Sequence, residues 1–133
     1  MRSVKVKDYM ASRLLTLKAD VSAVEAMRFF LQHGISGAPV VDDKGELIGV
    51  LSEVDLMQVV IQDSYYDENV GIVAEYMNFP VETVDANDDI YSLAERFIRE
   101  RRRRYPVLEN GQLVGQISRR DILHAVDDFL LKQ

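Results

Sequence analysis

Two short segments of the chain carry a serine and an aspartate at the same spacing. They are Ser52-x-x-Asp55 and Ser118-x-x-Asp121, and each follows a stretch that begins with a glycine and reads as the end of a β-strand. A serine at a helix N-cap and an acid three residues later satisfy free backbone N–H groups and complement the helix dipole. The pattern therefore predicts two strand-to-helix junctions, and this capping role alone accounts for both residue types.

Arginines are concentrated near the second junction, although the formal net charge of the chain is −6. They are Arg96, Arg99, Arg101 to Arg104, Arg119 and Arg120. An acidic chain with one basic stretch favours a local anion site over a general polyanion binder. Runs of like charge are also typical of solvated surface, and Glu95 and Glu100 stand at helical spacing to pair with Arg99 and Arg96. Both interpretations stay open for Arg96, Arg99 and Arg101.

Other kinds of chemistry find little support in the sequence. The absence of cysteine excludes disulfides, thiolate zinc sites and cysteine nucleophiles. His33 and His124 lie in different segments without a partnered carboxylate, so neither a metal site nor a catalytic base is expected. No apolar run approaches the length of a membrane span, and the first residues lack the apolar stretch of a signal peptide. We therefore expect a cytoplasmic protein that is not an enzyme.

The chain repeats itself. Asp8-Tyr9-Met10 recurs as Glu75-Tyr76-Met77 and Ala38-Pro39-Val40 as Tyr105-Pro106-Val107, both at an offset of 67 residues. The junctions are offset by 66, because the turn at residues 43–45 is one residue longer than the turn at 110–111. Such a change is tolerated in a hairpin turn, whereas a slip inside a strand would reverse its faces. The sequence predicts a duplication with repeats at residues 1–66 and 67–133.

Each repeat has the pattern of a small β-α-β-β-α module. Ser22 with Glu25 forms a capping box, and Asp89 begins the equivalent helix of the second repeat. Apolar residues at helical spacing follow each cap, and two short strands around a turn come next. Residues 54–61 and 122–131 read as a closing helix for each repeat. We expect an α+β protein in which two units, related by a pseudo-twofold axis, pack through their sheets.

The residues that carry a family resemblance are the strands and junctions. They are Ile35-Ser36-Gly37-Ala38-Pro39-Val40-Val41-Asp42, Leu47-Ile48-Gly49-Val50-Leu51-Ser52-Glu53-Val54-Asp55-Leu56, and their partners in the second repeat. Over nearly its whole length the chain resembles a tandem pair of CBS domains, often called a Bateman module. The resemblance implies a regulatory module that binds an adenine nucleotide (AMP, ADP or ATP) in a cleft between the repeats. It also implies a homodimer that signals to a regulated protein through a conformational shift.

The resemblance transfers a main site to numbered positions of this chain. Adenine would lie near Leu14, Leu15, Ile35, Ser36 and Ala38, ribose would meet Ser118 and Asp121, and phosphates would meet Arg103, Arg104 and Arg120. Guanidinium groups match phosphate oxygens in geometry and charge. Capping and ribose binding are compatible roles for the same aspartate.

A second site is expected to bind nucleotide more weakly. It would comprise Ser52, Asp55, Pro80, Val81, Arg102 and Tyr105. Glu53 and Val54 stand where the main site has Arg119 and Arg120, so anionic phosphate is less favoured there. Binding of an uncharged adenosine-type ligand at this site stays open, and so does S-adenosylmethionine as a ligand of the protein.

Two alternatives to the nucleotide sensor remain. The first is a dimerising or partner-binding scaffold that has lost its ligand, since residues 54–61 and 122–131 fit a subunit interface as well as a monomer core. The second is a nucleic-acid binder that uses Arg101 to Arg104. It is the weaker alternative, because Tyr105 is the only nearby aromatic residue placed to stack on a base.

Overall fold

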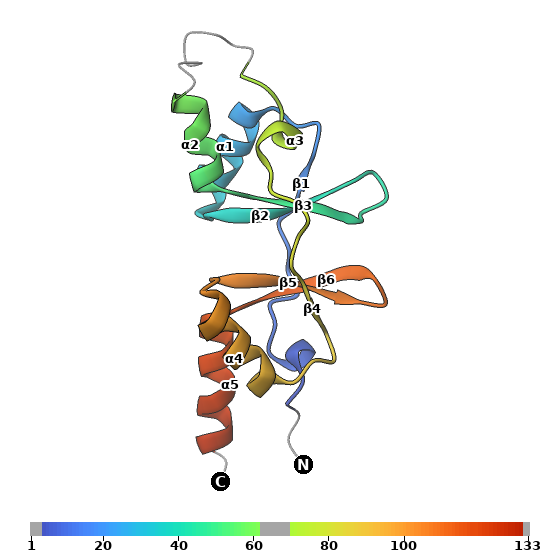
Figure 1. Ribbon diagram of the computed structural model, residues 1–133, viewed down its shortest axis with the longest axis vertical. Coiled ribbons are helices and arrows are strands. Elements are labelled where there is room, and N and C mark those ends of the chain that lie inside the picture. The colour runs from blue at the N-terminus through green and yellow to red at the C-terminus, as the bar shows by residue number, and fades with distance from the viewer. Residues whose placement is uncertain (1–3, 62–69, 132–133) are drawn as a thin grey trace. The chain divides into compact units, whose positions relative to one another are not determined.

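The computed structural model describes residues 4–61 and 70–131 (Figure 1). The chain divides into two compact units, which we treat separately. The central unit is Leu15–Val81, and the terminal unit combines Met1–Leu14 with Glu82–Gln133. The opening segment of each repeat therefore belongs to the same unit as the body of the other repeat. The predicted repeat boundary between residues 66 and 67 lies outside the described residues.

The central unit contains a three-stranded sheet in the order β1-β2-β3. Its elements are β1 (Leu17–Lys18), α1 (Ala23–His33), β2 (Gly37–Val41), β3 (Leu47–Ser52), α2 (Glu53–Ile61) and α3 (Val73–Tyr76). β1 pairs with β2 in parallel, and β2 pairs with β3 as an antiparallel hairpin. Helices α1 and α2 lie side by side against the sheet (Figure 1).

The terminal unit repeats this plan with a sheet in the order β4-β5-β6. Its elements are η1 (Val6–Asp8), β4 (Val84–Asp85), α4 (Ile90–Glu100), β5 (Arg104–Glu109), β6 (Gln112–Ser118) and α5 (Arg119–Leu131). The pairing is again parallel for β4 with β5 and antiparallel for β5 with β6. The predicted α+β class and the β-α-β-β-α order are confirmed in both units.

The helix boundaries follow the predicted capping chemistry. Ser22 Oγ accepts a hydrogen bond from Glu25 N at 3.1 Å, and Asp89 Oδ1 accepts one from Tyr91 N at 2.9 Å. Gly34 ends α1 in the left-handed region at φ 62°. Arg101 ends α4 in the same conformation at φ 56°, so the second repeat has a side chain at a position that favours glycine.

Each unit has its own cluster of buried side chains, and the opening segments contribute to both. In the central unit Val73 and Tyr76 pack with residues such as Phe30 and Leu51. In the terminal unit Val6 is fully buried in a cluster of strand and helix side chains. Burial of these residues explains why the opening segment of each repeat is held firmly beside the strands of its unit.

A glycine in each third strand permits this close packing. In the terminal unit, Ala11 and Gln116 exchange backbone hydrogen bonds of 2.9 Å in each direction. Gly115 lies beside this pair, and a Cβ atom there would stand 2.7 Å from Ala11 O and 2.7 Å from Met10 Sδ. Gly49 has an equivalent environment, with Met77 Sδ at 2.6 Å from a Cβ position. Glycine is therefore required at residues 49 and 115 because the opening segment passes too close for a Cβ atom.

Replacing Gly115 with alanine is expected to lower the free energy of unfolding by about 1 to 3 kcal/mol, because the new methyl group forces the opening segment away from β6. Urea denaturation measures the change. Gln112→Ala, at an exposed position of the same strand, is the control and should change stability by less than about 0.5 kcal/mol. Equal stability of the two variants would contradict the close approach.

Candidate functional site

The second Ser/Asp junction links β6 to α5. Ser118 N donates to Asp121 Oδ2 at 2.8 Å, and Asp121 N donates to Ser118 Oγ at 3.2 Å. The two residues therefore cap the helix reciprocally, as predicted. Asp121 is half-buried, and among the described residues only this hydrogen bond to its carboxylate is found.

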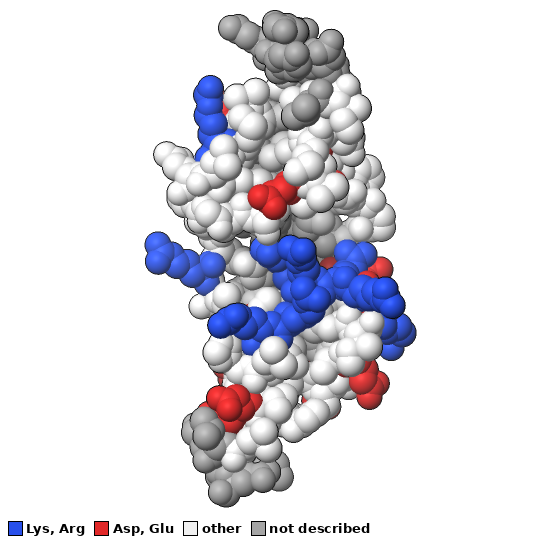
Figure 2. Space-filling model, turned by 90° about the vertical axis from the view of Figure 1, so that its left-hand side faces the viewer, with Lys and Arg blue, Asp and Glu red and all other residues white. Residues whose placement is uncertain are grey.

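Two of the predicted phosphate ligands lie directly beside this junction. Arg104 pairs with Ser118 in the β5–β6 register, and Arg119 N donates to Arg103 O at 3.2 Å. Arg120 follows in the first turn of α5, and the side chains of Arg103 and Arg120 are exposed. Basic side chains gather into one group on the face drawn in Figure 2. The terminal unit thus brings together the predicted ribose and phosphate contacts.

The predicted adenine contacts lie elsewhere in the chain. Leu14 ends the opening segment of the terminal unit, whereas Leu15, Ile35, Ser36 and Ala38 belong to the central unit. Ala38 is buried in the core cluster of that unit, and the other four are half-buried. Their role as adenine contacts stays a prediction.

The first Ser/Asp junction, between β3 and α2, has more internal hydrogen bonds. Ser52 donates to Asp55 Oδ2 from both its backbone N and its Oγ, each at 2.8 Å. Asp55 N donates back to Ser52 Oγ at 3.3 Å. Asn78 Nδ2 donates to Asp55 Oδ1 at 2.9 Å. Asp55 is 8% exposed, and both of its carboxylate oxygens have partners within the central unit.

The sequence-based site did not include Asn78. Its backbone exchanges hydrogen bonds with Val50 at 2.9 and 3.1 Å, which holds the side chain beside the junction. The sequence does distinguish the two repeats at this position, because Asn78 follows Tyr76-Met77 whereas Ala11 follows Tyr9-Met10. Two further residues predicted for the second site also lie in the central unit: Pro80 is exposed and Val81 is half-buried.

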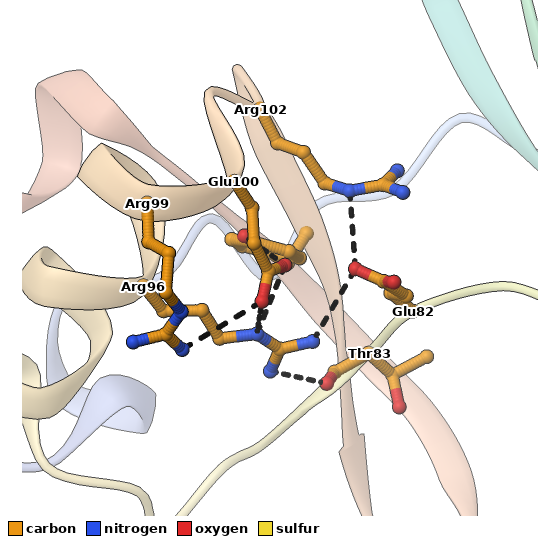
Figure 3. A network of polar contacts seen from close by, with 7 residues as sticks. Glu82, Thr83, Arg96, Arg99, Glu100 and Arg102 are labelled. Atoms are coloured by element: carbon orange, nitrogen blue, oxygen red, sulfur yellow. Dashed lines mark hydrogen bonds and ion pairs between the residues drawn. The ribbon is translucent and has the colours of Figure 1, made fainter.

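Arg102, which was predicted for the second site, belongs to a polar network of the terminal unit (Figure 3). Tyr105, predicted for the same site, joins this network through Glu100. Arg102 Nε lies 3.2 Å from Glu82 Oε2. Tyr105 is fully buried, and its Oη donates to Glu100 Oε1 at 2.8 Å. The Tyr105 side chain therefore offers no exposed surface to a ligand or a nucleic-acid base in this structure.

Arg96 lies at the centre of the same network. Its Nε lies 3.2 Å from Glu100 Oε2, and its Nη1 donates to Thr83 O at 2.9 Å. The guanidinium carbon also stands 4.5 Å from the centre of the Tyr105 ring, a cation–π distance. The predicted Arg96–Glu100 pair is confirmed, whereas within the described residues Arg99 pairs with Glu100 at 3.8 Å rather than with Glu95. Arg96 is therefore held in the structure by several short contacts, whereas the Arg99 side chain is 68% exposed.

The network shifts two pKa values in opposite directions. The hydrogen bond from Tyr105 lowers the pKa of Glu100 from its ordinary value of 4.5. Burial, together with the hydrogen bond to Glu100, raises the pKa of Tyr105 from 10.0 to about 12. Glu100 therefore contributes stability that is lost as the pH falls through its lowered pKa. Tyr105 contributes stability that is present below pH 10 and lost as the pH rises towards about 12.

Tyr105→Phe is expected to lower the free energy of unfolding at neutral pH by about 1 to 2 kcal/mol, because the variant loses the hydrogen bond to Glu100. It should also remove part of the loss of stability between pH 10 and about 12. Urea denaturation at several pH values measures both effects. Tyr91→Phe, at an exposed tyrosine of α4, is the control, and the same alkaline profile in both variants would contradict the assignment to Tyr105.

Two kinds of site receive no support from the described residues. No three histidine, cysteine or acidic side chains in residues 4–61 and 70–131 form a group that could hold a metal ion. No helix within those ranges is both long and apolar enough to cross a membrane.

Comparison with known families identifies the class of protein. The model of the CBS domain matches residues 6–62 and 73–128. The chain therefore belongs to the CBS domain family, as two domains in tandem. CBS domain pairs are generally regulatory rather than catalytic.

Individual relatives agree with this assignment. The chain is 30% identical over 132 residues to protein MK0525 of Methanopyrus kandleri, covering 98% of this chain and 66% of that protein. It is 30% identical over 129 residues to the A-adding tRNA nucleotidyltransferase of Aquifex aeolicus, covering 97% of this chain and 15% of the enzyme. The chain thus spans less than two thirds of the length of these relatives.

A solved structure matches over almost the full length of both chains. It is CBSX2, a CBS-pair protein of Arabidopsis thaliana, in complex with AMP. The TM-score is 0.84 at 25% sequence identity, and the match covers 96% of this chain and 99% of the other.

Proposed function

We propose that this protein is a non-enzymatic sensor of an adenine nucleotide (AMP, ADP or ATP), with the ribose bound at the Ser118–Asp121 junction. The observation that carries the proposal is the state of Asp121. Among the described residues its carboxylate accepts one hydrogen bond, so acceptor positions remain for the two ribose hydroxyls. A half-buried carboxylate also binds hydroxyl donors more strongly than one fully in water.

The charges near Asp121 support a ligand with phosphate groups. Arg103 and Arg120 are exposed next to the junction, whereas Arg96, Arg99 and Arg102 pair with glutamates. Phosphate oxygens accept bidentate hydrogen bonds from guanidinium groups, and the first turn of α5 adds the positive end of a helix dipole. An uncharged adenosine would lose these contacts and should bind more weakly.

The AMP complex of CBSX2 supports the choice of ligand class, because that chain has the same fold over nearly its full length. The regulatory role requires that the nucleotide bind one conformation more tightly than another. Association into homodimers and an effect on a separate regulated protein are parts of this proposal. Exposed apolar side chains on the helices are consistent with such contacts: Met27, Leu31, Val54, Met57, Ile61, Tyr91, Ile98, Leu123, Val126 and Leu130.

Thermal unfolding with AMP, ADP, ATP, adenosine and S-adenosylmethionine tests the proposal. A ligand present at about 100 times its Kd should add roughly 2.7 kcal/mol to the free energy of unfolding. We expect a larger stabilisation by AMP than by adenosine, and a loss of this difference in Arg103→Ala. Arg101→Ala is the matched control, since Arg101 is an exposed residue of the same run and lies outside the predicted site.

Two results would contradict the proposal. If no adenosine compound changes the unfolding temperature, the chain is better described as a dimerising or partner-binding scaffold. If Arg103→Ala and Arg101→Ala both weaken binding to RNA, with strong salt dependence and no effect of free AMP, the arginine run binds nucleic acid.

A further inference from the structure

The two opening segments place different residues at equivalent positions beside the two aspartates. Asn78 exchanges backbone hydrogen bonds with Val50 in β3, and Ala11 does the same with Gln116 in β6. Both residues follow a Tyr-Met pair at the repeat offset of 67 residues. The backbone geometry is therefore repeated, while the side chain differs between an amide and a methyl group.

This difference determines how many acceptor positions each carboxylate retains. Asp55 Oδ2 accepts hydrogen bonds from Ser52 N and Ser52 Oγ, and Asn78 Nδ2 occupies Oδ1 at 2.9 Å. A ribose diol could reach Oδ1 only by displacing the amide. Displacement would remove one charge-assisted hydrogen bond for each one gained, so little net affinity would result.

The equivalent carboxylate is open. Asp121 Oδ2 accepts one hydrogen bond, from Ser118 N, and no donor to Oδ1 is found among the described residues. Ala11 cannot supply one, because its side chain ends at Cβ. The burial of the two side chains agrees with this contrast, since Asp55 is 8% exposed whereas Asp121 is only half-buried.

We propose that the residue after the Tyr-Met pair decides which aspartate binds ribose. Asn78 acts as an internal substitute for the ligand and keeps the Ser52–Asp55 junction closed to nucleosides. Ala11 leaves the Ser118–Asp121 junction open. This inference rests on the proposed function and names the specificity-determining pair of its two sites. It is independent of the charge difference between the two junctions, where Glu53 and Val54 replace Arg119 and Arg120, because the hydrogen bond from Asn78 also opposes binding of uncharged nucleosides.

Exchanging the two residues tests the inference by titration calorimetry. Ala11→Asn should lower the affinity for AMP at least tenfold, because the new amide reaches Asp121 Oδ1. Ala11→Leu is the matched control, with similar side-chain bulk and no donor, and should keep the affinity within threefold. Asn78→Ala should raise the number of adenosine molecules bound per chain from one to two, since adenosine carries no phosphate for Glu53 to repel.

The outcomes separate this inference from the proposed function. Absence of AMP binding by the unmodified protein would contradict the proposed function itself. If the unmodified protein binds AMP, three other results would overturn only the inference about Ala11 and Asn78. They are an unchanged AMP affinity in Ala11→Asn, equal losses of AMP affinity in Ala11→Asn and Ala11→Leu, and an unchanged number of adenosine molecules bound by Asn78→Ala. Urea denaturation of each variant confirms that the titrated protein is folded.

Discussion

Alanine in place of Asp121 is expected to weaken AMP binding by at least about 100-fold, which corresponds to about 2.7 kcal/mol. The variant loses the carboxylate of its junction, and with it the two charge-assisted hydrogen bonds that we propose it makes to the ribose hydroxyls. Its free energy of unfolding should fall by only about 1 kcal/mol, because the side chain contributes one capping hydrogen bond, from Ser118 N. Titration calorimetry and urea denaturation measure the two effects.

The conservative control is Asp121→Asn, which retains the capping acceptor and loses the negative charge. It should keep nearly the full stability and still bind AMP at least about tenfold more weakly, since hydrogen bonds to a neutral amide oxygen are weaker. AMP affinity that survives both substitutions would contradict the role of Asp121 in ribose binding.

Alanine at the equivalent Asp55 is expected to have its main effect on stability instead. Asp55 is buried and accepts hydrogen bonds from Ser52 N, Ser52 Oγ and Asn78 Nδ2. Its removal leaves these donors without their acceptor, so the free energy of unfolding should fall by about 2 to 4 kcal/mol. Urea denaturation measures the difference from Asp121→Ala.

A second measurement on Asp55→Ala separates stability from binding. At a temperature where the variant is folded, its AMP affinity should stay within threefold of the unmodified protein. We therefore expect Asp121→Ala to weaken mainly AMP binding and Asp55→Ala to lower mainly the free energy of unfolding. A loss of stability for Asp55→Ala no larger than that for Asp121→Ala would refute this division of roles.

Much of the fold follows from local patterns in the sequence. The duplicated junctions, the capping box of Ser22 and Glu25 and the Asn110-Gly111 turn predict the β-α-β-β-α order that both units have. Each of these signals depends on residues a few positions apart. The grouping of Arg103, Arg104 and Arg120 beside the Ser118–Asp121 junction follows equally well, because β5, β6 and α5 are consecutive in the sequence. The ribose and phosphate roles of these residues rest on the family resemblance and stay a prediction.

The interactions that the sequence did not reveal join residues distant along the chain. Asn78 reaches Asp55 across 23 positions, and it does so because the opening segment of one repeat packs on the strands of the other. Arg102 pairs with Glu82, which precedes β4 in the same repeat and the same unit. Periodicity describes one element at a time and carries no information on such pairs. The difference in charge between the junctions was visible in the sequence, and the comparison of Ala11 with Asn78 within the duplication points to the difference in hydrogen bonding.

The most direct measurement is a crystal structure of the protein with AMP. Our account predicts one nucleotide per chain, with its ribose hydroxyl oxygens about 2.6 to 3.2 Å from the Asp121 carboxylate and its phosphate near Arg103 or Arg120. It also predicts that the Asn78 hydrogen bond to Asp55 remains in place. AMP bound with its ribose on Asp55, or a structure grown in saturating AMP that contains none, would contradict the central claim.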